Sequence, residues 1–210
     1  MQFSVFTRVS PFLLCLIDDM YLIVGLGNPE NAYKWTRHNI GFETINKLAY
    51  DNNIDMSKTK HRAHIGTGAV VGCKVILAKP YTYMNLSGES IGAILKYYDI
   101  HTDNLIVIHD EIALDVGKVR LKYGGGAGGH NGVTNTIHHT KTENFLRVRI
   151  GVGSKPPGFK LSNYVLSRFL PQEHDAIVDG VDRAGEAICY ALMHGRDKAM
   201  NIYNQRSTEK

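Results

Sequence analysis

The segment Tyr21–Pro29, which reads YLIVGLGNP, decides the fold that we expect for this chain. Tyr21–Leu26 is an apolar run interrupted only by one glycine, and a run of this length and composition is typical of a buried β-strand. The run stops at Gly27-Asn28-Pro29, where three residue types that favour turns follow one another. The segment therefore predicts a strand that enters a turn, with Asn28 as the polar side chain of that turn.

The rest of the chain alternates between strand and helix patterns. Strands are predicted at 105–108, at 118–122, at 146–152 and in a hairpin about Gly72, and helices are predicted after Thr36, after Asn85, from about Asn131, from near Pro171 to Gly195 and over 196–204. Alternating strands and helices favour the α/β class, and the hairpin adds antiparallel pairs. We therefore expect a single-domain three-layer sandwich with a twisted mixed β-sheet flanked by helices.

Size and composition are those of an ordinary globular protein. The chain has 210 residues, of which 43% are hydrophobic and 21% charged, and its formal net charge is only +4. We expect one domain over residues 20–210, preceded by an N-terminal extension, 1–19, that is not part of the fold. The extension has the basic-then-apolar order of a signal peptide, but its apolar core is short and no small-residue cleavage site follows. No stretch approaches the roughly 20 apolar residues that span a bilayer.

A histidine and a carboxylate are the first candidates for chemistry. His38 has a side chain suited to general base catalysis near neutral pH. Asp110 directly follows the end of the 105–108 run, and open α/β sheets place their sites at such strand ends. Asp110 is therefore the expected partner of the base. His38 could also be a polar residue at a helix start, and His109 and His130 compete with it for the role of base.

Three asparagines follow the same pattern of strand-to-helix junctions. Asn28, Asn85 and Asn131 each lie beside turn or helix-start chemistry, so each has a structural interpretation as a turn residue or N-cap. Together they also offer neutral amides that can pair with a peptide backbone or donate to an oxyanion.

The region after residue 117 combines basic residues with glycines. Gly124–Gly129 can cradle an anion, but no Gly-Lys-Ser/Thr follows it, so it is not a P-loop. Gly25-Leu26-Gly27 is likewise no dinucleotide fingerprint, because Glu30 occupies the place of the third glycine. Period-two alternation predicts a basic stripe that suits a phosphate track, or a solvated strand face. The predicted stripe contains Lys118, Arg120, Lys122, Arg147 and Arg149.

Two tyrosines and a group of histidines complete the candidates. Tyr33 and Tyr83 could stack on a base, or pack as half-buried aromatics. His130, His138 and His139 lack a recognised metal-ligand spacing, and no metal site is predicted.

Several of these segments, in this order, resemble the bacterial peptidyl-tRNA hydrolase family from Tyr21 to about Asn204. The segments that carry the resemblance are LIVGLGNP at Leu22–Pro29, Tyr33, TRHN at Thr36–Asn39, YMNLSG at Tyr83–Gly88, HDE at His109–Glu111, GGHNG at Gly128–Gly132 and RVRIGVG at Arg147–Gly153.

The resemblance implies hydrolysis of the ester that joins a peptide to the 3′ end of tRNA, without metal or cofactor. It implies that His38 is the base, that Asp110 supports it, and that Asn28 distinguishes blocked from free amino groups. It implies substrate contacts by Tyr33, Tyr83, Asn85 and Asn131, and tRNA phosphate contacts by Lys122 and Arg149.

Family members are typically cytoplasmic monomers, and the partner implied here is peptidyl-tRNA, held at its acceptor end and 5′ phosphate region. Ala127 departs from the family pattern, because a histidine often occupies that place in the glycine loop. The first nineteen or so residues have no family counterpart. Two other functions remain open at this stage. One is a tRNA-binding module with a structural histidine, and the other is a zinc-independent peptidase.

Overall fold

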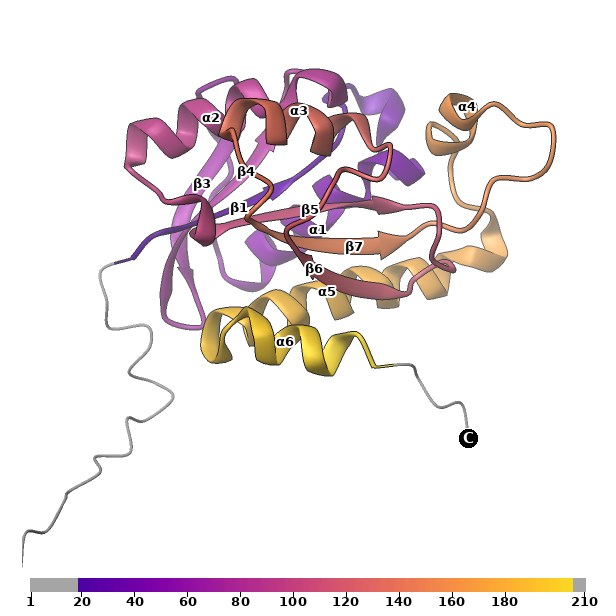
Figure 1. The fold of residues 1–210 in the computed structure, drawn as a ribbon. Coiled ribbons are helices and arrows are strands. Elements are labelled where there is room, and N and C mark those ends of the chain that lie inside the picture. Colours follow the sequence, from indigo (N-terminus) through magenta and orange to yellow (C-terminus); the bar gives the residue numbers. More distant parts are fainter. Residues whose placement is uncertain (1–18, 206–210) are drawn as a thin grey trace, which may run out of the picture.

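A seven-stranded mixed sheet crosses the computed structural model, which describes residues 19–205 (Figure 1). The strand order is β2-β3-β4-β1-β5-β7-β6. The central strands β4, β1, β5 and β7 are parallel, whereas β2, β3 and β6 pair antiparallel at the two edges. The strands are β1 (Tyr21–Gly25), β2 (Lys58–Lys60), β3 (Ala63–Val70), β4 (Cys73–Pro80), β5 (Leu105–Glu111), β6 (Val119–Tyr123) and β7 (Leu146–Gly151).

Helices cover both faces of the sheet, so the predicted three-layer sandwich is confirmed. In Figure 1, α2 and α3 lie on one face, and α1, α5 and α6 lie on the other. The α-helices are α1 (Ile40–Asp51), α2 (Ser87–Tyr98), α3 (Asn131–Thr140), α4 (Leu161–Val165), α5 (His174–His194) and α6 (Arg196–Tyr203). Short 3-10 helices span Asn31–Tyr33, Arg37–Asn39, Met84–Leu86, Thr102–Asn104 and Pro171–Glu173.

Strand β1 contributes to both hydrophobic cores, because successive side chains of a strand point to opposite faces. Ile23 packs in the core under α1 and α5, whereas Leu22 and Val24 pack in the core under α2 and α3. All three side chains are fully buried. The apolar run of β1 is continuous because each face of the sheet is covered by helices.

The carboxyl ends of the adjacent central strands β1 and β5 lie side by side, at the end of the sheet that we call its carboxyl edge, and α1 starts close to them. Leu26 N donates to Ile108 O at 2.9 Å, which extends the pairing of β1 and β5 beyond Gly25. A Cβ added to Gly25 would lie 2.1 Å from Gly41 O, so the first turn of α1 touches the β1 backbone. This close approach places the residues just before α1 beside the end of β5.

The predicted elements are present, but several boundaries need correction. Strand β5 extends to Glu111, so Asp110 lies within the strand instead of just after it, because the β5–β7 pairing continues through these polar residues. Strand β6 is shifted by one residue from the predicted 118–122, and β2 and α4 were not predicted. A further correction lies near Thr36. The helix predicted there begins at Ile40, after the 3-10 turn Arg37–Asn39. The Thr36 hydroxyl donates to Tyr33 O at 2.8 Å instead of capping a helix, because it serves the preceding turn. Of the predicted N-terminal extension, residues 1–18 lie outside the described residues. Within residues 19–205, no helix has both the length and the apolar character needed to cross a membrane.

Candidate active site

The carboxylate of Asp110, near the end of β5, is the centre of a three-residue network. Its Oδ1 accepts hydrogen bonds from His38 Nδ1 at 2.8 Å and from His130 Nε2 at 2.9 Å. Burial by itself would raise the pKa of Asp110, but the adjacent His130 and His38 outweigh burial and hold the pKa well below the usual carboxyl range. Asp110 is therefore ionised at neutral pH and orients both imidazoles.

The hydrogen bonds also distinguish the three histidines that competed for the role of base. His38 directs Nδ1–H to Asp110, and Nε2 has no hydrogen-bond partner among the described residues. His130 uses both ring nitrogens, since Nδ1 accepts from Val133 N at 3.3 Å while Nε2 donates to Asp110. His130 is thereby the N-cap of α3, a place that the sequence had suggested for Asn131.

His109 points away from this network and is 2% exposed. Its Nδ1 donates to Asp110 O at 2.8 Å, and its Nε2 is buried without a partner in the described part of the chain. Burial, and secondly the nearby His130, lower the pKa of His109 to about 3. A histidine that is neutral and sealed from solvent cannot exchange protons with a substrate, so His109 is a structural residue.

The Asn28 amide is oriented by two other segments. Asn28 Oδ1 accepts from Met84 N at 3.0 Å, so its NH2 group is left without a protein acceptor among residues 19–205. The Asn28 backbone is held by Asn39, which accepts from Asn28 N at 2.9 Å and donates to Asn28 O at 2.8 Å. The turn predicted after β1 is therefore rigid, and it presents two amide protons.

These groups line a cleft of about 540 Å³ at the carboxyl edge of the sheet. His38, Asn28, Asn85 and Asn131 all border it, and in the described region Asn85 and Asn131 make no side-chain hydrogen bond to protein. Neither asparagine caps a helix as its sequence position allowed: Asn85 lies inside a 3-10 turn and Asn131 is the first residue of α3. Their amides are therefore free to contact a ligand. The cleft is also lined by the glycine loop and by Leu161, Val165 and Leu166 around α4.

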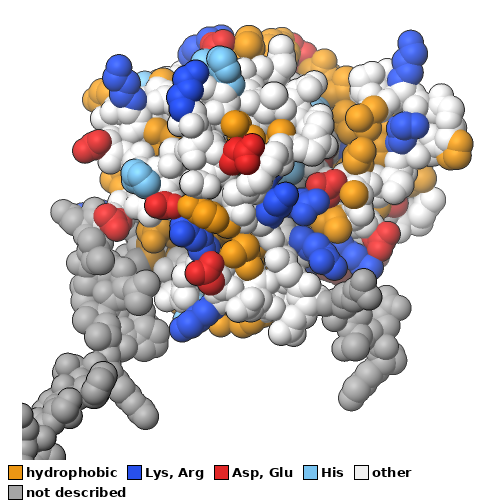
Figure 2. Space-filling model, in the orientation of Figure 1, with side chains coloured by type: hydrophobic (Ala, Val, Ile, Leu, Met, Phe, Trp, Pro, Cys, Tyr) orange, Lys and Arg blue, Asp and Glu red, His pale blue; other side chains and the backbone are white. Residues whose placement is uncertain are grey.

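Basic residues do lie opposite one another on the adjacent strands β6 and β7, as predicted, but the prediction was wrong for Arg147. Arg120 pairs with Arg149 and Lys122 pairs with Arg147 across β6 and β7, and Lys and Arg side chains gather over these strands in Figure 2. The Arg147 side chain is buried, however, and donates to the carbonyls of Gly124, Gly125 and Gly126. These hydrogen bonds hold the guanidinium inside the protein, so Arg147 supports the glycine loop instead of facing solvent.

The remaining candidates lie outside the cleft wall. Arg149 donates through Nε and Nη2 to Glu111 Oε2 at 2.9 and 2.6 Å, and Glu111 lines the cleft. Lys122 is exposed and borders the glycine loop. Tyr83 is exposed and donates its hydroxyl to Glu30, and Tyr33 is half-buried in a 3-10 turn. Neither tyrosine lines the cleft.

The ligand atoms of His38, Asp110 and His130 lie within 4.8 Å of one another, as in some metal sites. A ring nitrogen must lose its proton before it binds a metal. Here both facing nitrogens use that proton to bond Asp110 Oδ1. A cation would have to replace both hydrogen bonds, so this geometry suits proton transfer better.

Known proteins are similar to this chain in sequence and in fold. The family model of peptidyl-tRNA hydrolase matches residues 22–210. The peptidyl-tRNA hydrolase of Lachnoclostridium phytofermentans is 48% identical over 187 residues, 89% of this chain and 98% of that protein. That of Geobacillus thermodenitrificans is 47% identical over 186 residues, 89% of this chain and all of the other. The crystal structure of peptidyl-tRNA hydrolase from Acinetobacter baumannii superposes with a TM-score of 0.82 at 37% identity, and covers 88% of this chain and 94% of that one.

The chain belongs to the peptidyl-tRNA hydrolase family. Sequence reasoning left two positions of this family member without a role. Asn39 locks the Asn28 backbone, and Met84 N fixes the direction of the Asn28 amide. The only local signal for Asn39 was its place in TRHN, where an asparagine before a helix suggests an N-cap. No sequence signal could have identified Met84, because its backbone N–H is the group that acts.

Proposed function

We propose that this chain hydrolyses the ester between the peptide and the 3′ end of tRNA in peptidyl-tRNA with a water molecule that His38 activates. The observation that carries the proposal is the hydrogen bond from His38 Nδ1 to Asp110 Oδ1 at 2.8 Å, which leaves Nε2 as the acceptor beside the cleft. An imidazole that donates one ring N–H to a carboxylate and keeps its other nitrogen at the cleft has the arrangement of a general base.

In the proposed reaction, water attacks the carbonyl carbon of the ester while His38 Nε2 takes one of its protons. Asp110 stabilises the imidazolium that results. The carbonyl oxygen gains negative charge, and the uncharged amides near His38 can donate to it. The bond to the ribose 3′ oxygen then breaks, and His38 returns the proton to that oxygen. The products are free tRNA and a peptide with a new carboxylate.

Three amides that border the cleft are assigned to the substrate. Asn28 points its NH2 group at the substrate because Met84 N occupies its Oδ1. A rigid N–H donor of this kind suits the carbonyl of a blocked amino group but offers no acceptor to a free ammonium. Asn28 is therefore proposed to distinguish blocked from free amino groups. Asn131 and Asn85, which line the same cleft as His38 and have free side chains among the described residues, are proposed to hold the peptide backbone.

The tRNA is proposed to lie over β6 and β7, where Lys122 and Arg149 face the 5′ phosphate region beside the acceptor end. Lys122 is exposed, and Arg149 keeps Nη1 available while Nε and Nη2 bond Glu111. Cations that bind phosphate oxygens position a nucleic acid without reading its sequence. Tyr33 and Tyr83 lie beyond the cleft wall, and we propose that they contact the substrate outside the reacting ester.

We also infer a cytoplasmic monomer that works without a cofactor. All residues assigned above come from one chain, so the proposed site needs no second copy. Light scattering at assay concentration tests the monomer, and exhaustive chelation before assay tests the absence of a metal requirement. Activity that chelation abolishes and zinc restores would contradict the proposal.

The deciding experiment measures release of N-acetyl-aminoacyl groups and of unblocked aminoacyl groups from tRNA. Wild-type protein should release the blocked group much faster. His38→Ala should lower turnover by roughly 10²–10⁴-fold, the usual cost of losing a general base. His138→Ala, at an exposed histidine on α3 outside the cleft, is the matched control and should keep full activity. A His38→Ala rate within a few-fold of wild type would remove His38 from this role, and no release by wild type would favour a tRNA-binding module.

A further inference from the structure

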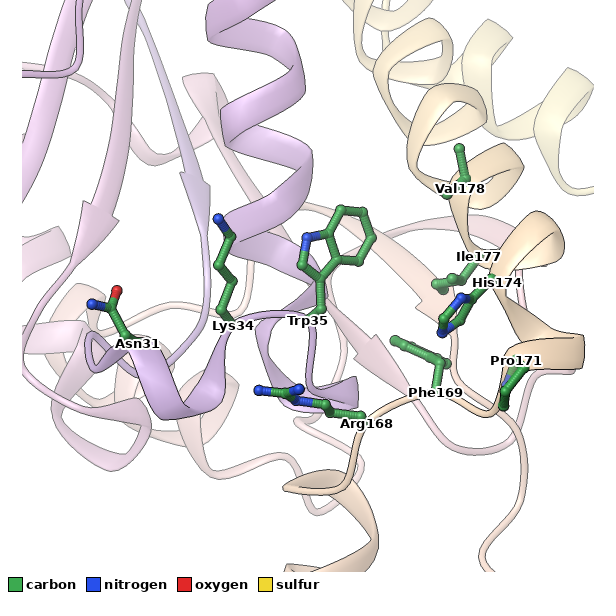
Figure 3. Close-up of a pocket in the computed structure, with 9 residues that line it drawn as sticks. All are labelled: Asn31, Lys34, Trp35, Arg168, Phe169, Pro171, His174, Ile177 and Val178. Carbon is green, nitrogen blue, oxygen red and sulfur yellow. The ribbon is translucent and has the colours of Figure 1, made fainter.

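A second cavity, of about 640 Å³, lies between the turn that precedes His38 and the start of α5 (Figure 3). Its walls are apolar and include Trp35, Phe169, Ile177 and Val178. It shares no lining residue with the active-site cleft. Cavities of this size and apolar character are typical of small-molecule sites. We call this cavity the Trp35 pocket.

Trp35 itself is held in an unusual conformation at this pocket. Its φ is +58°, in the left-handed region that bulky residues avoid, and its side chain is 38% exposed. The backbone is fixed there because Trp35 N donates to Glu43 Oε1 at 3.2 Å and the next residue, Thr36, bridges to Arg168. Strained residues persist where the surrounding structure enforces them, and they concentrate at binding sites. The indole ring, held in this position and partly exposed, forms an apolar wall of the pocket.

Two cations border the same pocket without a counter-ion. In residues 19–205, the side chains of Lys34 and Arg168 make no hydrogen bond or ion pair, and no carboxylate lines the pocket. The two acidic residues nearby are already engaged. Glu43 accepts from Trp35 N and from Asn46, and Glu173 accepts from Arg37 and from Leu170 N. No carboxylate therefore lies in the pocket wall to pair with either cation.

The charges and the apolar surface lie on different sides of the indole ring. Figure 3 shows Lys34 to the left of Trp35 and Arg168 below it, with their charged ends apart, whereas Phe169, Ile177 and Val178 lie to the right. A ligand that satisfies both sides has an apolar body and an anionic end. A nucleotide fits less well, because the polar edges of its base would meet apolar walls and remain unpaired.

We propose that the Trp35 pocket binds a small aromatic carboxylate, whose ring packs between Trp35 and Phe169 and whose carboxylate is bound by Arg168, while Lys34 adds positive charge at the pocket border. The planar guanidinium of Arg168 matches a carboxylate in geometry as well as charge. The occupant lies against the segment that carries His38, because Arg37 N donates to Ser167 O at 3.0 Å beside the Thr36–Arg168 bridge. It does not enter the active-site cleft.

Trp35 is the only tryptophan of the chain, so its fluorescence reports on this pocket alone. The probes are 4-phenylbutyrate and its uncharged amide, 4-phenylbutanamide. The carboxylate should give a saturable change, and the amide should bind at least about tenfold more weakly, since it lacks the charge that Lys34 and Arg168 recognise. No saturable change up to about 10 mM, the weak end of small-ligand affinity, or equal affinity of the two probes would overturn the proposal.

Three variants separate this site from non-specific binding. Arg168→Gln should weaken the carboxylate about tenfold and leave the amide unchanged. Arg183→Gln removes an equivalent charge from α5 outside the pocket, and should change neither affinity. Val178→Phe, at a partly exposed wall position, should weaken both probes by filling the space. If Arg183→Gln acts like Arg168→Gln, or if Val178→Phe has no effect, the ligand binds elsewhere and the proposal is wrong.

Discussion

Acid should destabilise this protein largely through His109, the buried neutral imidazole of β5. The pKa of His109 falls from 6.5 to about 3 on folding because burial penalises the charged ring. Its Nε2, where a second proton would bind, is buried without an acceptor in the described structure. Between these two pKa values the unfolded chain binds a proton that the folded chain does not, so the free energy of unfolding falls as the pH falls.

The magnitude follows from the same two pKa values. The difference between 6.5 and about 3 corresponds to about 5 kcal/mol of unfolding free energy, fully present above pH 6.5 and lost as the pH approaches 3. At pH 4.5 about 3 kcal/mol of it should already be lost. This pH is still above the usual aspartate pKa of about 3.9, so the depressed pKa of Asp110 has not yet begun to matter.

Urea unfolding at pH 7 and at pH 4.5 measures this loss. His109→Asn keeps a donor near the position of Nδ1 for Asp110 O but cannot titrate. Wild type should lose about 3 kcal/mol more than His109→Asn between the two pH values. His138→Asn, at an exposed histidine, should lose as much as wild type. If wild type and His109→Asn lose the same free energy, His109 is not the acid-sensitive group and the reasoning from its burial fails.

The other predictions concern activity. Asp110→Asn should lower turnover and move the acid limb of the pH–rate profile, because protonated His38 loses the carboxylate at 2.8 Å. If the acid limb does not move, Asp110 does not stabilise the protonated form of His38. Asn28→Asp should reduce the preference for blocked over free aminoacyl-tRNA, since a carboxylate attracts an ammonium, and an unchanged rate ratio would refute the assignment. Lys122→Gln or Arg149→Gln should raise KM for peptidyl-tRNA, spare saturated turnover, and flatten the log–log salt slope by about 0.7–0.9 per phosphate contact. A peptidyl ester of a short CCA fragment should show neither change, and equal weakening of both substrates would exclude phosphate contacts.

The sequence by itself determined the class of the fold and most of its elements, but not β2 or α4. Strand β1 was readable because six neighbouring residues are nearly all apolar, and α5 because its apolar stripe recurs at helical spacing and ends at a glycine with φ +85°. The hairpin about Gly72 followed in the same way. These signals are local, so each was present within a short window of the chain.

Local patterns were insufficient where a distant group decides the outcome. Period-two alternation placed Arg147 on a basic strand face, but carbonyls more than twenty residues away bury its guanidinium. Asn85 and Asn131 suited helix caps by sequence, yet His130 caps α3, and both asparagines line the cleft.

The three candidate histidines show the same limit most clearly. Nothing local distinguished His38, His109 and His130, since each lies beside polar residues at the end of an element. The family resemblance favoured His38, and the fold shows how the three differ: it buries His109, engages both nitrogens of His130, and brings His38 to Asp110 across 72 positions of sequence. The sequence supplied the side chains, whereas tertiary structure decided which ring nitrogen stays free, because that depends on burial and hydrogen bonds between residues far apart in the chain.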